Sequence, residues 1–279
     1  MKHAYLILAH NEFDVLRRLV LALDSTSNDI YVHIDKRIKT LPSLHADVSS
    51  LHIIEDRVKS FWGDVSLAEA ELNLLAAAIK NGPYDYYHII SGTHFPVKKL
   101  PVIESYFLAK EGSSVMMPMD TSREEIEMKM GKRHFFLRHL VDKRKWLKGI
   151  YHFCWLTVLH FQKKRVGDVS FVTGKASQWC SLTDAAALAL VYSRAQIIEN
   201  YKHSFCCDEF FVRSFLEKQG LPIIFDNQFC YIDFVNTAPR TLNGADYDML
   251  VKGPFLFARK MSSKQNELVD KLLSFVKNG

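Results

Sequence analysis

The sequence has no apolar run long enough to cross a bilayer, and it has few cysteines. The apolar stretch at residues 4–9 falls far short of the roughly 18 residues that a membrane span needs, and His10, Asn11 and Glu12 follow it at once, which excludes a signal core there. The five cysteines are odd in number and lack metal-site spacing, so we expect reduced thiols without disulfides. These absences predict a soluble, intracellular protein.

The common short catalytic motifs are absent as well. There is no G-x-G-x-x-G, Walker loop, H-E-x-x-H or G-x-S-x-G, so dinucleotide, phosphate-loop, zinc-hydrolase and serine-hydrolase functions lack their signatures. Asp246 and Asp248 form an Asp-x-Asp, a common metal-binding signature, but they follow a loop near the C-terminus instead of an early apolar strand. We therefore interpret this motif as a turn and helix cap, and a metal-dependent enzyme that uses Asp246 and Asp248 is the alternative.

The composition is that of an ordinary globular chain. It has 279 residues, 48% of them hydrophobic and 24% charged, which excludes disorder, collagen and a coiled coil for the whole chain. The net charge of +5 is mild, and we expect no nucleic-acid partner. The length predicts one large domain or two fused lobes, with any boundary inside the loop-rich stretch around residues 115–170.

Apolar runs alternate with stretches of helical periodicity. This order predicts an α/β fold with a Rossmann-type, mostly parallel sheet flanked by helices. The expected strands cover residues 4–9, 30–34, 51–54, 86–90, 170–172 and 223–225, and the expected helices cover 14–23, 67–80, 182–192, 208–217 and 264–277. Ligands of such sheets bind beyond the carboxyl ends of the strands. The polar clusters at residues 10–12, 35–37 and 91–94 are therefore the first candidates for a site.

A basic and aromatic segment interrupts this order at residues 132–165. It holds about ten Lys or Arg side chains and one Asp, interleaved with aromatic residues that include Trp146 and Trp155. A basic amphipathic helix at an anionic surface has this composition. The alternative is a hydrated helix whose aromatic side chains pack on the sheet. Both interpretations remain open from the sequence.

Seven short blocks stand in order along the chain: AYLILAHNE at residues 4–12, HIDKR at 33–37, FWG at 61–63, IISGTHFPV at 89–97, SQW at 177–179, DEFF at 208–211 and LFARK at 256–260. Together they resemble the core-2/I-branching β-1,6-N-acetylglucosaminyltransferase family, glycosyltransferase family 14, which includes the peptide O-xylosyltransferases. The resemblance spans nearly the whole chain and suits a bacterial member without the stem, anchor and disulfides of the animal enzymes.

The resemblance implies a GT-A-like fold and one glycosyltransferase domain over residues 1–279. Its nucleotide-binding half would cover about 1–115, a basic and aromatic insertion about 120–168, and the acceptor and catalytic half about 169–279. It also implies inverting transfer from a UDP-sugar without a metal. Inversion needs a general base, and Glu209 matches the family's catalytic Glu. We also expect Asp208 to contact the acceptor. The plain alternative for this block is a helix start with acidic residues in its first turn and Asp208 as its cap.

Cations must neutralise the departing UDP if no metal does. Arg240 and Lys260 match the family's diphosphate-binding pair. The match is firmer at Lys260, and Arg259 is a substitute for Arg240. Two solvated surface cations are the alternative.

The remaining site residues also follow from the resemblance. His10 and Asp35 would hold the uridine and ribose, and Trp62 with Gly63 would form a wall for the nucleotide sugar. Trp179 would stack on an acceptor sugar, although both tryptophans are equally ordinary as core residues.

The sequence thus predicts a UDP-sugar-dependent transferase, with N-acetylglucosamine as the expected sugar and a glycan or lipid-linked acceptor. UDP-xylose is the alternative donor, and a non-catalytic sugar-nucleotide-binding or glycan-binding protein is the alternative class. The expected place is the cytoplasm, with peripheral contact at the inner membrane through residues 132–165.

Overall fold

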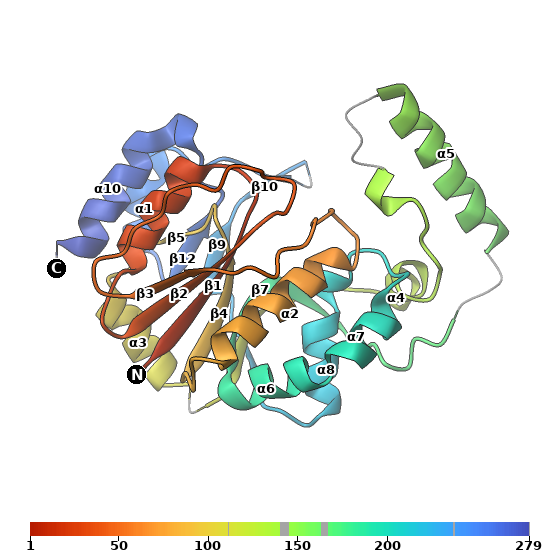
Figure 1. Ribbon diagram of the computed structural model, residues 1–279, viewed down its shortest axis with the longest axis horizontal. Coiled ribbons are helices and arrows are strands. Elements are labelled where there is room, and N and C mark those ends of the chain that lie inside the picture. Colours follow the sequence, from red (N-terminus) through yellow and green to blue (C-terminus); the bar gives the residue numbers. More distant parts are fainter. Residues whose placement is uncertain (111, 140–144, 163–166, 237, 279) are drawn as a thin grey trace.

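A seven-stranded mixed sheet forms the centre of the protein (Figure 1). The structure is a computed structural model that describes the chain except residues 111, 140–144, 163–166, 237 and 279. The strand order is β3-β2-β1-β4-β7-β6-β8, and all the strands are parallel except β7. The strands are β1 His3–Ala9, β2 Asn28–Ile34, β3 Ser50–Ile53, β4 Tyr86–Ser91, β6 Ser114–Met119, β7 Lys175–Thr183 and β8 Ile223–Phe225. The predicted fold class, α/β with a mostly parallel Rossmann-type sheet, is confirmed.

Helices cover both faces of this sheet. Helices α1 (Phe13–Leu23) and α10 (Asn266–Lys277) pack together on one face, while α2 (Ser66–Ile79) and α6 (Asp184–Tyr192) lie on the other (Figure 1). The apolar side of α1 is buried at the positions that its helical periodicity predicts. The other helices are α3 Leu100–Leu108, α4 Arg123–Lys129, α5 Lys145–Phe161, α7 Arg194–Tyr201, α8 Phe211–Lys218 and α9 Tyr247–Lys252, with 3-10 turns η1 Leu137–His139, η2 Cys207–Glu209, η3 Gly244–Asp246 and η4 Ser263–Gln265.

Two small sheets complete the fold. The first contains β5 (Phe95–Pro96), β12 (Phe257–Arg259) and β9 (Cys230–Ile232), and the second contains β10 (Phe234–Val235) and β11 (Ala238–Pro239). Strand β5 follows β4 closely in the chain and pairs with β12. This pairing brings residues from the end of the chain beside the carboxyl end of β4.

The direction of the chain across the sheet changes at β1. From β1 it continues through β2 to β3 on one side, and it returns to β4 on the other side of β1. The carboxyl ends are held close, since the Asp35 amide donates to the Ala9 carbonyl at 2.9 Å and the Gly92 amide donates to the Leu8 carbonyl at 2.8 Å. A Cβ at Gly92 would lie 2.9 Å from the Cβ of Ala9, so only glycine allows this approach. Ligands of open α/β sheets bind at such a switch point.

Two of the predicted elements differ in the structure. Residues 170–172 form a turn instead of a strand, because the Ser170 amide bonds to the Asp168 carboxylate at 2.8 Å and the Val172 amide bonds to the Val169 carbonyl at 2.9 Å. The expected helix at 208–217 is divided into η2 and α8, because Phe210 between them leaves the helical backbone conformation. The five cysteines are free, as expected. In the described part of the chain, no helix has the length and apolar character needed to span a bilayer.

Candidate functional site

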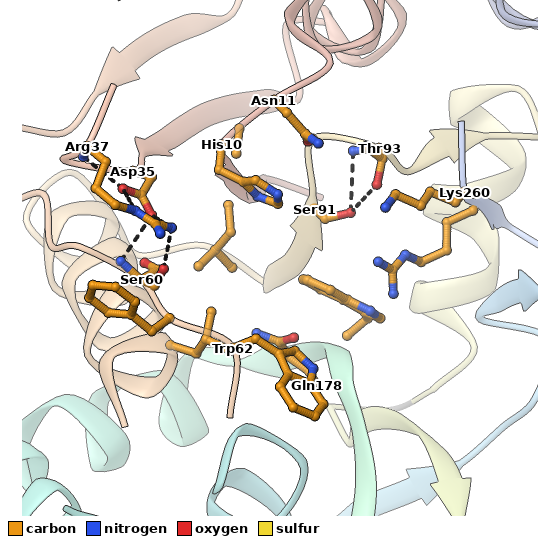
Figure 2. A pocket seen from close by; sticks show the side chains of 17 residues that line it. His10, Asn11, Asp35, Arg37, Ser60, Trp62, Ser91, Thr93, Gln178 and Lys260 are labelled. Atoms are coloured by element: carbon orange, nitrogen blue, oxygen red, sulfur yellow. Dashed lines mark hydrogen bonds and ion pairs between the residues drawn. The ribbon is translucent and has the colours of Figure 1, made fainter. Parts of the chain in front are cut away.

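A pocket of about 420 Å³ opens at the switch point of the sheet (Figure 2). Its walls come from the loops after β1, β2 and β4, from the segment before α2, from the middle of β7 and from the end of β12. The predicted residues His10, Asp35, Trp62, Trp179 and Lys260 all line it. Residues far apart in the sequence therefore meet where the topology predicts a ligand.

One end of the pocket is organised by Asp35. Its carboxylate is buried and accepts hydrogen bonds from the Arg37 amide at 2.8 Å, from the Arg37 guanidinium at 2.9 and 2.7 Å, and from the Ser60 amide at 3.0 Å. Burial alone would raise the pKa of Asp35, but these bonds outweigh burial and lower it. These four bonds use the four lone-pair sites of the carboxylate. A ribose hydroxyl would have to share one of them with Arg37 or with the Ser60 amide.

Two further side chains shape this end of the pocket. The Arg37 guanidinium lies over the Phe61 ring, 4.8 Å from its centroid. His10 extends into the pocket between the Asp35 end and the loop after β4 (Figure 2). The surrounding protein desolvates the His10 ring and lowers its pKa, so the ring is neutral at pH 7. A neutral imidazole can both donate and accept hydrogen bonds there.

The opposite end of the pocket carries two cations from the end of β12. Lys260 lies across the pocket from Asp35 (Figure 2). The guanidinium of Arg259 lies 4.9 Å from the centroid of the Trp179 ring, and its buried Nε has no hydrogen-bond partner among the residues that the structure describes. Burial lowers the pKa of Arg259. Among the described residues, no carboxylate forms an ion pair with either cation.

Arg240 does not line this pocket. Its guanidinium forms two bonds to the Asp246 carboxylate, at 2.9 and 2.6 Å, and a further bond to the Asp233 carboxylate. Asp246 also accepts the Asn243 amide at 2.8 Å and completes the capping box of η3. Asp246 is therefore a turn and cap residue, as the sequence predicts, and Asp248 lies in the first turn of α9 (Tyr247–Lys252). Arg240 is held by two carboxylates, in contrast to Arg259.

Glu209 lies on η2, outside the pocket lining. Its carboxylate is 3.2 Å from the Lys175 ammonium and 3.6 Å from the Lys129 ammonium. Both lysines also contact Glu125, at 3.1 and 2.8 Å. The Cys206 amide donates to the Gly63 carbonyl at 2.9 Å and joins η2 to the segment that carries Trp62. Glu209 is thus connected to the pocket rim through one backbone hydrogen bond.

Trp62 and Gly63 form this rim. The Trp62 side chain is 66% exposed and meets the Phe205 ring edge to face, with 5.3 Å between the ring centroids. Gly63 has a φ of 76°, and a Cβ there would lie 2.5 Å from the Phe205 ring. Both the backbone conformation of the rim and its close packing on Phe205 therefore require glycine at position 63.

Two interacting carboxyl groups behind the pocket lining, those of Glu71 and Asp208, were not predicted as a pair. Gln178 lines the pocket and donates to the Glu71 carboxyl at 2.7 Å, and Glu71 is fully buried. Burial, with a contribution from Asp208, raises the pKa of Glu71 well above its ordinary value. Burial and the charge of Glu209 raise the pKa of Asp208 to about 7. No described residue forms a hydrogen bond with Oδ1 of Asp208. The helical spacing of α2 places Glu71 on the apolar side that holds Leu67 and Leu74. A carboxyl group on that side is the sequence feature from which a buried acid could have been predicted.

Comparisons with known proteins show what this chain is similar to. The family model described as Branch: Core-2/I-Branching enzyme matches residues 3–240. A crystal structure of 2-C-methyl-D-erythritol 4-phosphate cytidylyltransferase from Thermus thermophilus is similar at a TM-score of 0.40 and 10% identity, over 91% of this chain and 99% of that one. No curated protein matches the chain. The family match includes every predicted site residue except Lys260.

Proposed function

Because the chain belongs to the Core-2/I-branching enzyme family, a family of glycosyltransferases, we propose that it transfers N-acetylglucosamine from a UDP-sugar to a hydroxyl of a glycan or lipid-linked acceptor. The transfer inverts the anomeric centre. The acceptor oxygen forms a bond to the anomeric carbon, the bond from that carbon to the diphosphate oxygen breaks, and the acceptor's proton goes to a protein base.

The observation that carries this proposal is the pocket, which has two cations at one end and, at the other, the Asp35 carboxylate with its four hydrogen bonds. The Asp35 and Arg37 end, with the Phe61 ring, offers polar and aromatic contacts to a nucleoside. Arg259 and Lys260 lie at the other end and suit a diphosphate, which gains negative charge as it leaves. Two fixed cations supply this stabilisation without a divalent ion.

We assign to Arg259 the role that the resemblance gives to Arg240. Two carboxylates already compensate the Arg240 charge, and moving it to a phosphate would break three hydrogen bonds to these carboxylates. Arg259 lines the pocket, and no described residue accepts a hydrogen bond from its Nε or forms an ion pair with it. A buried cation without a compensating anion is costly, and a bound diphosphate removes that cost.

Glu209 is our proposal for the base that receives the acceptor proton. The support is its match to the family's catalytic Glu and its backbone connection to the Trp62 rim through Cys206 and Gly63. Trp62 and Trp179 line the same pocket and offer ring faces or edges for a sugar.

The test is a screen of UDP-N-acetylglucosamine, UDP-xylose and other UDP-sugars for binding and slow hydrolysis, each with and without EDTA. We expect saturable UDP binding and a hydrolysis rate that EDTA does not change. A rate that returns only with Mn²⁺ or Mg²⁺ contradicts the metal-independent mechanism. Binding with no turnover on any acceptor favours a sugar-nucleotide-binding protein, and this alternative is consistent with Glu209 being engaged by two lysines.

A further inference from the structure

Helix α5 (Lys145–Phe161) stands away from the central sheet and carries an exposed apolar face (Figure 1). The large side chains of this face are Trp146, Ile150, Phe153 and Phe161, which are 67%, 50%, 70% and 81% exposed. At 3.6 residues per turn they fall on one side of the helix. Exposed aromatic side chains of this size rarely gather on a free surface of a monomeric protein.

The opposite side of α5 is the side that holds it to the protein. The Trp155 indole donates to His134 at 3.2 Å, and its ring lies 5.7 Å from the Phe205 ring, measured between centroids. The Tyr151 ring stacks on His139 with 4.4 Å between the centroids. From the sequence, the aromatic residues of this segment could either pack on the protein or be exposed at a surface. Trp155 packs on the protein, whereas Trp146 is exposed.

The charge of the segment indicates what the exposed face contacts. Helix α5 contains no Asp or Glu, and its exposed Lys148 lies seven positions before Trp155, on the same side of the helix as that residue. In the sequence, residues 132–165 hold ten Lys or Arg against the single Asp142. Apolar side chains alone would suit another protein or a neutral surface. Together with an excess of cations, they match the interface of an anionic bilayer, which attracts both kinds of side chain.

We propose that α5 is a peripheral membrane anchor that lies in the interface of an anionic bilayer and inserts Trp146, Ile150, Phe153 and Phe161. The helix is about 25 Å long, and its one-sided apolar face suits an orientation parallel to the surface. A lipid-linked acceptor would be presented at the same surface. The proposal does not depend on the transfer chemistry, because it concerns where the protein binds.

The test is co-sedimentation of the full chain with vesicles of phosphatidylcholine alone, or of phosphatidylcholine mixed with phosphatidylglycerol. We expect the protein to pellet with the anionic vesicles at about 50 mM NaCl, to be released at about 500 mM NaCl because salt screens the attraction, and to stay in solution with neutral vesicles. Binding to neither vesicle overturns the proposal. Equal, salt-independent binding to both overturns its anionic part.

Matched variants assign the binding to α5. Phe153→Ser should weaken the partition constant about tenfold, whereas Tyr192→Ser, which alters an 84% exposed aromatic residue on α6, should not. Equal effects of these two substitutions overturn the proposal. A dimer that Phe153→Ser dissociates, without vesicle binding, identifies a second copy as the occupant instead. UDP binding, measured in parallel, should stay at the wild-type level in both variants.

Discussion

The guanidinium of Arg259 lies 4.9 Å from the centroid of the Trp179 ring, and in the described part of the chain no group accepts a hydrogen bond from its buried Nε. The indole holds the cation in place by a cation–π contact and leaves its N–H groups available to the pocket. Arg240 shows the opposite arrangement, since its N–H groups are directed to Asp233 and Asp246. Two arginines near the end of the chain thus differ in what they can offer a ligand.

This difference predicts the effect of removing each arginine. Arg259→Met should weaken UDP binding about tenfold to a hundredfold, since a charge-assisted hydrogen bond contributes about 1.5–3 kcal/mol. Isothermal titration calorimetry with UDP, without added metal, measures this change. The stack on Trp179 is largely retained by the methionine side chain, so folding should be preserved.

Arg240→Met is the matched control. It removes the same charge but should leave UDP affinity almost unchanged, with a loss of thermal stability because Asp233 and Asp246 lose their partner. If Arg240→Met weakens UDP binding as much as Arg259→Met does, the assignment returns to Arg240.

The second prediction concerns the base. Glu209→Gln should keep UDP binding while kcat falls by roughly 10²–10⁴, the usual effect of losing a general base. The control is Glu125→Gln, because Glu125 contacts the same two lysines as Glu209. A role in holding Lys129 and Lys175 would make the two variants equally slow. Equal rates would remove Glu209 from the chemistry, and so would full activity of Glu209→Gln.

Part of this site could be predicted from sequence pattern because the pattern is local. An apolar run that ends in a polar cluster marks the carboxyl end of a buried strand, and His10 and Asp35 follow β1 and β2 in that way. Parallel pairing then brings the two ends together. The same argument predicts the loop after β4. Three walls of the pocket are therefore consequences of strand order.

The partners of the charged groups could not be predicted, because they depend on contacts between distant segments. Nothing local to Arg240 shows that Asp233 and Asp246 both turn toward it. Likewise, Glu71 and Gln178 are separated by 107 positions and meet only because α2 packs over the sheet that contains β7. The prediction of a strand at residues 170–172 was also wrong, because the Asp168 carboxylate accepts a hydrogen bond from the Ser170 amide and stabilises a turn there.

The third prediction is a pH dependence that originates at Asp208. Its pKa is raised from 3.8 to about 7 because burial and Glu209 disfavour the charged form. The folded state therefore binds the proton more tightly than the unfolded state, and the free energy of unfolding falls as pH rises from about 4 to about 7. Asp208→Asn removes this dependence. The variant should gain about 1–3 kcal/mol relative to the wild type between pH 5 and pH 8.

Urea unfolding at the two pH values measures this change, and Asp226→Asn is its control. The pKa of Asp226 is lowered, because bonds from the Gln228 amide, Tyr106 and Lys110 outweigh burial. Asp226 is thus charged in both states from pH 5 to pH 8, and its substitution should cost the same at both values. A wild-type-like pH slope in Asp208→Asn would show that another group causes the dependence.

The last prediction concerns the glycine of the pocket rim. Gly63 and Gly220 both have positive φ, 76° and 66°, but a Cβ at Gly63 meets the Phe205 ring at 2.5 Å while a Cβ at Gly220 meets nothing within 4 Å. Gly220→Ala should therefore show the backbone strain alone, about 1–2 kcal/mol. Gly63→Ala should cost more, because Phe205 must move and Trp62 packs on that ring. Thermal unfolding gives the difference in stability, and UDP-sugar binding should weaken only in Gly63→Ala. Equal costs in the two variants would mean that Phe205 gives way freely, and the rim would then be adaptable instead of fixed by Gly63.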